Sequence, residues 1–368
     1  PLFILMGNLV NHSGLSRNLY DASNAFIGHR RGGLAMATIL ASGGFAAVCG
    51  SSIATAATIS TVALPSMRRY GYSPALSTGS IAAGGTLGIL IPPSVIMIIY
   101  GSMTETSIGH LFIAGIVPGV LAVLLYMAAV SATTVLDPAA GPAGPRLAWA
   151  DRFRALRDVW MVLALFVIVI GGIYLGVFTP TEAAGIGATG AFVAALLRRS
   201  LKFTEFIRIL FDSARTSAAL MAVLVGALIF SNFVNITGAP EAVVEALKSL
   251  NFPPLGVMAL ILIFYLFLGC VFDALAMILL TVPIFFPLVM ALGYDPVWFG
   301  IIVVVVVELG LITPPIGMNL FVIQSVARDI PMTTIYRGIF PFIVVDIIRL
   351  AILVLFPWIV LFLPRQMG

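Results

Sequence analysis

The sequence predicts an all-α polytopic membrane protein that contains an internal repeat. Hydrophobic residues make up 61% of the 368 residues and charged residues only 9%, whereas soluble domains carry about a quarter charged residues. Uncharged runs reach or approach the roughly 20 residues that a helix needs to cross a bilayer. These runs cover 32–67, 70–104, 106–136, 159–181, 216–240, 249–272 and 309–327. Together they allow about ten spanning or re-entrant segments.

Two Pro-Pro pairs mark the repeat. Gly-Ile-Leu-Ile-Pro-Pro at 88–93 recurs as Gly-Leu-Ile-Thr-Pro-Pro at 310–315, and Gly-Tyr-Ser-Pro at 71–74 recurs as Gly-Tyr-Asp-Pro at 293–296. Proline inside a helix removes a backbone donor and clashes with the preceding turn. Corresponding broken helices in two halves of a membrane chain indicate the binding site of a secondary transporter.

The first repeat is expected at 1–136. It begins without an initiator Met, and we expect its N-terminal part to be missing. Two apolar halves at 32–67 flank the small residues Cys-Gly-Ser-Ser at 49–52, which predicts a re-entrant hairpin with its tip at membrane depth. A broken helix should follow at 75–101, and a further span at 108–135.

The middle region is expected at 137–215. It should contain a Pro/Gly/Ala-rich loop, two apolar segments at 159–178 and 182–197, and an amphipathic basic arm at 201–215. Basic residues cluster on both sides of the apolar pair, at Arg146, Arg152, Arg154 and Arg157 and again at Arg198, Arg199, Lys202 and Arg208. A helical hairpin brings both clusters to one face, which the positive-inside rule assigns to the cytoplasm. The net charge of +4 therefore reflects topology rather than nucleic-acid binding.

The second repeat is expected at 216–368. It should contain a hairpin at 255–291, a broken helix at 296–327 and a last span at 338–363. In that span Asp346 and Arg349 lie three residues apart, so they should pair on one helix face. With the same offset that relates the Pro-Pro pairs, the interruption of the second hairpin places Asp273 opposite Ser51.

Oxygen donors gather at the two predicted hairpin tips. Ser51 and Ser52 follow Gly50 at a chain interruption where free carbonyls also converge, and a hard cation such as Na⁺ prefers oxygen donors. Asp273 lies between apolar runs, where an ionised carboxylate costs several kcal/mol unless it is paired. Because no Lys or Arg occurs at 249–327, a cation or a proton is its natural partner. The alternative is a hydrogen bond to free amides at the tip.

Further polar residues flank the Pro-Pro breaks. Ser94 follows the first pair, and Thr313 and Asn319 flank the second. Half-helix ends at such breaks present aligned partial charges, so these residues are candidate ligands or substrate contacts. Glu308, two residues before the second break glycine, can coordinate a cation, relay a proton or cap exposed amides.

The sequence gives little support for an enzyme. His12, His29 and His110 are scattered without metal-ligand spacing, and neither a GxSxG elbow, a Walker loop nor a CxxC pair occurs. Cys49 and Cys270 lie in apolar, glycine-rich surroundings that favour small buried thiols over a disulfide. We expect a protein that is not an enzyme and that needs no cofactor.

Motifs along the whole chain resemble the large membrane (M) subunit of tripartite ATP-independent periplasmic (TRAP) transporters, the DctM-like subunit. They are PLFILMG at 1–7, RRGGLA at 30–35, CGSSIAT at 49–55, GILIPPS at 88–94, FTPTEAA at 178–184 and FGIIVVVVVELGLITPPIGMNLFV at 299–322. The resemblance implies inverted repeats and an elevator mechanism, in which a transport domain of two hairpins and two broken helices slides against a scaffold domain.

The resemblance also implies partners and a driving force. Such subunits reside in the bacterial inner membrane and are driven by a Na⁺ gradient. They work with a small four-helix membrane subunit (DctQ-like) and a periplasmic solute-binding protein (DctP-like) that delivers an organic acid. A stand-alone Na⁺/dicarboxylate symporter of similar fold, which needs no binding protein, is the alternative. A passive channel would require more polar pore-lining residues than the sequence offers.

Carried onto this sequence, the resemblance implies two Na⁺ sites. The first would use Ser51, Ser52 and the backbone near Ser94. The second would use Asp273 and the backbone from Gly310 onward, with Thr313 or Asn319 assisting. The candidate substrate contacts near these sites are Thr55, Pro92, Pro93, Pro314 and Asn319.

Overall fold

The computed structural model describes residues 1–199, 201–238, 245 and 253–367, and every regular element in these residues is a helix. The elements of the first repeat are α1 (Leu2–His12), α2 (Leu15–Ile27), α3 (Gly33–Cys49), α4 (Ser52–Arg69), α5 (Pro74–Leu90), α6 (Val95–Thr104) and α7 (Ile108–Leu136). The middle region holds η1 (Pro138–Ala140), α8 (Trp149–Tyr174) and α9 (Pro180–Leu197), followed by the long α10 (Phe203–Ile236).

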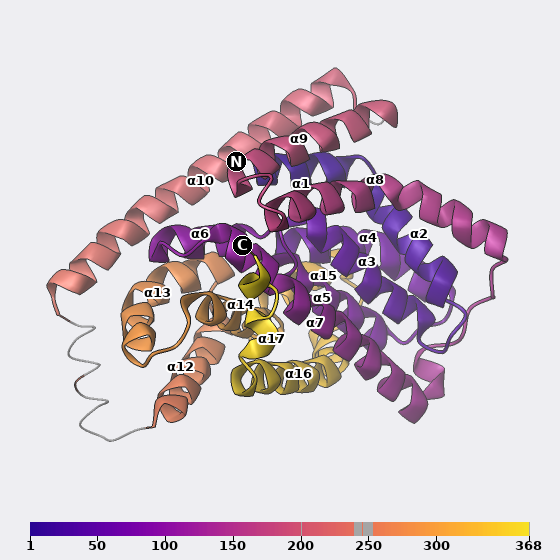
Figure 1. Cartoon of the computed structure of the whole chain (residues 1–368). Coiled ribbons are helices and arrows are strands. Elements are labelled where there is room, and N and C mark those ends of the chain that lie inside the picture. The colour runs from indigo at the N-terminus through magenta and orange to yellow at the C-terminus, as the bar shows by residue number, and fades with distance from the viewer. Residues whose placement is uncertain (200, 239–244, 246–252, 368) are drawn as a thin grey trace.

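The second repeat contains the corresponding helices (Figure 1). They are α12 (Pro254–Gly269), α13 (Ala274–Ala291), α14 (Pro296–Ile312), α15 (Met318–Val326), α16 (Met332–Leu355), α17 (Trp358–Leu361) and η2 (Pro364–Gln366). The pairs α3–α4 and α12–α13 coincide with the segments predicted as hairpins. The pairs α5–α6 and α14–α15 coincide with the predicted broken helices.

The recurring Gly-Tyr-x-Pro motif starts the first half of each broken helix. Gly71 and Gly293 adopt positive φ values of 72° and 81°, a conformation that glycine takes without steric cost. The next-but-one residue caps the helix: Ser73 Oγ accepts a hydrogen bond from Leu76 N, and Asp295 Oδ1 accepts one from Val297 N. Proline then occupies the first helical turn, where its missing donor costs nothing. The motif therefore recurs because both helices need the same turn and cap.

Several helices differ from the expected boundaries, and α8, for instance, begins at Trp149 rather than at 159. α10 runs from Phe203 to Ile236 without a break, so the boundary between the middle region and the second repeat at 215–216 falls inside a helix. No Pro or Gly occurs between 203 and 225, and the change from amphipathic to apolar sequence does not end a helix by itself. The last span begins at Met332, earlier than position 338, and its helix ends at Leu355, just before Pro357.

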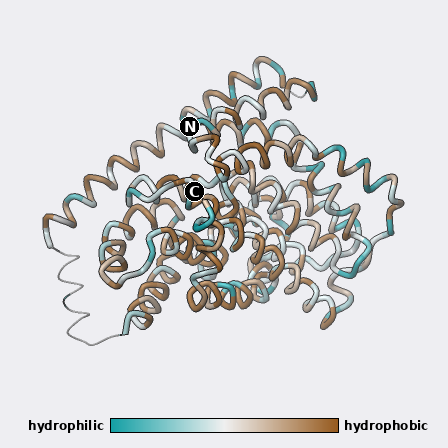
Figure 2. The backbone as a smooth tube through the Cα atoms, viewed as in Figure 1, coloured by the Kyte–Doolittle hydropathy of each residue, from teal (hydrophilic) through white to brown (hydrophobic). Residues whose placement is uncertain are grey.

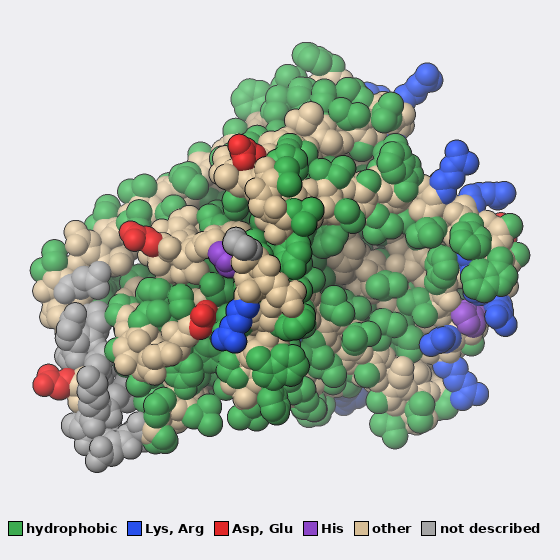
Figure 3. Space-filling model, viewed as in Figure 1, with side chains coloured by type: hydrophobic (Ala, Val, Ile, Leu, Met, Phe, Trp, Pro, Cys, Tyr) green, Lys and Arg blue, Asp and Glu red, His purple; other side chains and the backbone are tan. Residues whose placement is uncertain are grey.

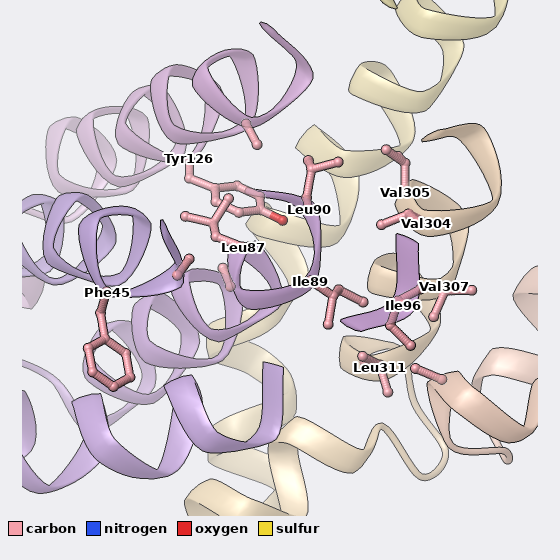
Figure 4. Close-up of a cluster of buried hydrophobic side chains, with 14 of the residues drawn as sticks. Phe45, Leu87, Ile89, Leu90, Ile96, Tyr126, Val304, Val305, Val307 and Leu311 are labelled. Carbon is pink, nitrogen blue, oxygen red and sulfur yellow. The ribbon is translucent and has the colours of Figure 1, made fainter. Parts of the chain in front are cut away.

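Helices α5 and α14 form the centre of the molecule. Almost every residue of both is buried, and both pack against α7 and α16. Figure 4 shows Leu87 and Leu90 of α5 meeting Tyr126 of α7, with Val304 of α14 nearby. Small residues allow the α5 and α16 backbones to touch, since a Cβ at Gly79 would clash with the carbonyl of Gly338.

The surface is that of a multi-pass membrane protein. Seven helical segments of the described residues are long and apolar enough to cross a membrane, the broken helix Pro74–Thr104 included. Hydrophobic residues dominate α10, α12 and α16 along their exposed lengths (Figure 2). Lys and Arg side chains gather at the right-hand end of the molecule, near the start of α8 (Figures 1 and 3). By the positive-inside rule this end faces the cytoplasm.

Candidate functional site: a cavity between two hairpin tips

The two hairpin tips line one central cavity. Its volume is about 300 Å³, and Ser51, Ser52 and Asp273 all contribute to its wall. The remaining wall comes from α1, α5, α6, α10 and α14. Candidate cation ligands from two tips that are far apart in the sequence therefore border a single space, which is large enough for a small organic molecule.

The first tip is tightly packed against the first helix break. Ser51 Oγ caps α4 by accepting from Ala54 N at 3.4 Å, and Thr55 Oγ1 donates to Ser51 O at 2.8 Å. A Cβ at Gly50 would lie 2.7 Å from the carbonyl oxygen of Pro93, and a Cβ at Gly88 would lie 2.5 Å from that of Ser51. Tip and break form one unit because glycine allows their backbones to approach.

The second tip packs against the second break in the same manner. A Cβ at Gly310 would lie 2.6 Å from Cα of Gly269, and Gly317 N donates to Cys270 O at 3.4 Å. Asp273 Oδ2 accepts from Leu275 N at 3.1 Å and so caps α13. Within the described residues, no Lys, Arg or His nitrogen comes within 4.0 Å of the Asp273 carboxylate. One of its oxygens therefore caps α13, and the carboxylate has no basic partner in the part of the chain that the structure describes.

Asn319 connects the two repeats. Its Nδ2 donates to Ser52 Oγ at 2.7 Å, and both side chains are buried. The resemblance placed Asn319 beside the second site, whereas its side chain reaches the first tip. The Oδ1 atom of Asn319 is buried without a partner among the described residues, so an acceptor faces the interior next to Ser52.

The remaining candidates lie in the breaks and outside the cavity wall. Ser94 is buried and caps α6 through Met97 N, and Pro92 and Pro93 are buried beside it. Thr313 Oγ1 donates to Leu309 O at 2.5 Å, while Pro314 is exposed. The Pro-Pro peptide bond is cis in both breaks.

Sequence reasoning missed three polar residues of the cavity wall. Asn8 and Asn11 on α1 and Thr216 on α10 line the cavity together with the tips. Asn11 Oδ1 accepts from Thr58 Oγ1 at 3.0 Å, and Asn8 Nδ2 donates to Ser213 Oγ at 2.8 Å. Two asparagines three residues apart in an apolar helix share one face, and that spacing is the signal that was available.

A buried charge cluster lies apart from the cavity. Arg349 contacts Asp346 at 3.0 Å, as the sequence predicted, and also Glu308 at 2.8 Å. Tyr126 OH donates to Asp346 Oδ2 at 2.6 Å and lies 3.1 Å from Thr86 Oγ1. The sequence left three roles open for Glu308: binding a cation, relaying a proton or capping exposed amides. The structure supports none of them directly, because the Glu308 carboxylate pairs with Arg349. The guanidinium joins α14 to α16.

Both cysteines are free thiols, as predicted, although only Cys270 is buried and Cys49 is partly exposed. Cys49 is the last residue of α3, and Cys270 directly follows α12. Each therefore lies at a hairpin tip, where a small side chain allows close packing.

Comparison with known proteins identifies, along almost the whole chain, the family that the sequence motifs resemble. The family described as "Tripartite ATP-independent periplasmic transporter, DctM component" matches residues 1–359. The chain is 39% identical to the C4-dicarboxylate TRAP transporter large permease protein DctM of Pseudomonas aeruginosa, over 100% of this chain and 86% of that protein. It is 34% identical to the sialic acid TRAP transporter large permease protein SiaM of Vibrio cholerae, over 99% of this chain and 85% of that protein.

A solved structure shares the fold. The crystal structure of the YdaH transporter of Alcanivorax borkumensis superposes with a TM-score of 0.68, covering 97% of this chain and 84% of that one. The sequences are 16% identical, so this likeness concerns the fold alone.

Proposed function

Since this chain belongs to the family of DctM components of tripartite ATP-independent periplasmic transporters, we propose that its central cavity binds an organic acid together with Na⁺. Membership makes the chain a large permease subunit, hence a transporter rather than an enzyme, in the bacterial inner membrane. The relatives carry different acids, C4-dicarboxylates in one and sialic acid in another. We therefore propose a carboxylate as the shared chemical class of the substrate.

The observation that carries the proposal is the meeting of both hairpin tips at one cavity. Each tip joins the C-terminal end of one helix to the N-terminal end of the next. The N-terminal ends of α4 and α13 carry partial positive charge, which favours a carboxylate. The C-terminal ends of α3 and α12 present carbonyl oxygens, which suit Na⁺. One cavity thus offers both kinds of contact.

The charge of Asp273 gives a reason for coupling. The substrate carboxylate adds a negative charge to a cavity that already borders an unpaired carboxylate, and burying two like charges is unfavourable. A bound Na⁺ offsets this repulsion. Substrate and cation should therefore bind with positive cooperativity, and neither should cross efficiently alone.

We further propose that the tips and breaks move as one body against α8–α10. The close glycine contacts make each tip and break a single packed unit. In contrast, α8 and α9 pack mainly on α2 and α1. The tips, α1 and α10 together line the cavity, an arrangement that suits an elevator. A small membrane subunit and a periplasmic binding protein complete the proposed transporter.

The test is Na⁺-driven uptake into proteoliposomes that contain this chain, its small subunit and its binding protein. Asp273→Asn should reduce uptake of the transported organic acid at least about tenfold, because it removes the charge that a cation offsets. Asparagine also caps helices well, so α13 should remain intact. Asp295→Asn, which changes a capping carboxylate outside the cavity, is the matched control and should transport normally.

The outcomes separate the alternatives. Uptake that needs the added binding protein supports the tripartite transporter, whereas uptake without it supports a stand-alone symporter. Equal uptake by Asp273→Asn and the unmodified protein removes Asp273 from the mechanism. If no organic acid moves under a Na⁺ gradient, the proposal of Na⁺ coupling is wrong.

A further inference from the structure

A group of basic side chains surrounds the turn between α2 and α3 at the cytoplasmic end. Arg152 lies in the first turn of α8 and is only 5% exposed. Arg154, two residues further along the same helix, has a side chain that is 77% exposed. The positive-inside rule accounts for an excess of basic residues on this face, but it does not account for the burial of one of them.

Two nitrogens of the Arg152 guanidinium find no hydrogen-bond acceptor in the part of the chain that the structure describes. Nε and Nη2 of Arg152 are both buried without a partner among the described residues. The ring of Trp149 lies 4.8 Å from the guanidinium carbon, which accounts for one face of the group and leaves its edge unsatisfied. Buried charged donors without acceptors are costly. An acceptor that is not part of the described chain would remove this cost.

The neighbouring groups add positive potential. His29 Nδ1 is also buried without a partner among the described residues. Burial and then the nearby guanidinium groups of Arg152, Arg146 and Arg30 lower the pKa of His29. The positive charges of three arginines are therefore close enough to disfavour protonation of the His29 imidazole. The acidic residue beside Arg152, Asp151, lies 3.7 Å from Arg154 instead.

The backbone points to an anion as well. α8 begins after Ala148 without a side-chain cap, and the amides of Asp151 and Arg152 donate to Ala148 O. Among the described residues the amides of Trp149 and Ala150 have no backbone acceptor, so they and the positive end of the helix dipole are available beside Arg152. An acceptor with several oxygens can satisfy both the guanidinium edge and these amides. Phosphate groups have this geometry.

The apolar surroundings indicate where such a phosphate comes from. Trp149 and Phe153 are 61% and 62% exposed, although they lie beside the basic cluster. Aromatic side chains at this level are typical of the membrane interface, and exposed apolar residues below them can contact acyl chains. We propose that Arg152, with Arg146 and the first turn of α8, binds the phosphate of an anionic phospholipid of the cytoplasmic leaflet, such as phosphatidylglycerol.

The experiment measures lipid binding by the full chain, alone and with its small membrane subunit. Purified protein is titrated with phosphatidylglycerol, phosphatidylcholine or inorganic phosphate, while thermal unfolding and lipid retention by native mass spectrometry are recorded. Phosphatidylglycerol should raise Tm more than phosphatidylcholine and should remain bound. Arg152→Gln should weaken its binding about tenfold, whereas Arg154→Gln, the exposed control on the same helix, should leave it unchanged.

Each outcome decides the proposal. Equal stabilisation of the unmodified protein by the two lipids overturns it, whether or not Arg152→Gln folds. Stabilisation by inorganic phosphate alone indicates a site for a free anion and overturns the assignment to lipid. If the small subunit abolishes lipid binding, the cluster belongs to a subunit interface, and the proposal is wrong for the assembled transporter.

Discussion

The two helix breaks share a motif but differ in their surroundings. Pro92, Pro93 and Ser94 of the first break are buried, whereas Pro314 and Pro315 of the second are exposed. The tips differ too, since the first carries hydroxyl groups and the second carries the carboxylate of Asp273. A repeat can therefore preserve backbone geometry while its two copies acquire different chemistry, so two sites related by the repeat need not be equivalent.

The repeats converge on one buried network. Thr86 and Glu308 occupy matched positions two residues before the break glycines, and both join the cluster around Arg349 and Tyr126. Thr86 contributes a hydroxyl and Glu308 a carboxylate, which is the same difference that distinguishes the two tips. Arg349 thus pairs with Glu308, the carboxylate of the second repeat, whereas Thr86 of the first repeat joins the cluster through Tyr126.

The largest expected effect tests this network. Arg349→Met should lower the stability of the protein by about 3–5 kcal/mol, because Glu308 and Asp346 lose the cation that compensates them in the core. Thermal unfolding in detergent measures the change. Arg337→Met, on an exposed position of the same helix, is the control. Equal stability of the two variants would show that the carboxylates are not held ionised by Arg349.

The asymmetry of the tips should appear in Na⁺ binding. Asp273→Asn should weaken Na⁺-dependent thermal stabilisation about 10–100-fold in Na⁺ concentration, whereas Ser51→Ala should weaken it about 2–10-fold, since a charged ligand contributes more than a neutral one. Choline chloride at equal ionic strength controls for screening. Equal effects of both substitutions would make the two tips equivalent and would contradict the comparison.

The break glycines test whether tip and break are one unit in both repeats. Gly88→Ala and Gly310→Ala should each destabilise the protein by about 1–3 kcal/mol, because the added methyl group meets backbone atoms of the opposing tip. Gly226→Ala is the control: a Cβ at this helical glycine meets no other described residue within 4 Å beyond its own helix, so the change should be neutral or slightly stabilising. If only one of the two substitutions lowers the stability, tip and break do not pack in the same way in both repeats.

The smallest effect concerns the hydrogen bond between the repeats. A double-mutant cycle of Asn319→Ala and Ser52→Ala should give a coupling energy of about 0.5–1.5 kcal/mol. Unfolding midpoints of the four proteins provide the measurement. Strict additivity of the single substitutions would mean that Asn319 does not support the first tip.

The sequence by itself determined where the two broken helices begin and where they break. Capping, positive-φ glycines and prolines act on residues within one turn, so Ser73, Asp295 and the Pro-Pro pairs could be interpreted from their neighbours alone. The pairing of Asp346 with Arg349 is equally local. The continuity of α10 was missed because a change of polarity suggested a boundary where no helix-breaking residue stands.

Only the tertiary structure decided which distant groups meet. Asn319 reaches Ser52 in the other repeat, Glu308 pairs with Arg349 on α16, and Asn8 lines the same cavity as the tips. These contacts depend on how the two repeats pack, and helical periodicity fixes a residue's face but not its neighbour on another helix. The sequence thus specified two chemically different tips, and packing placed both of them at one cavity.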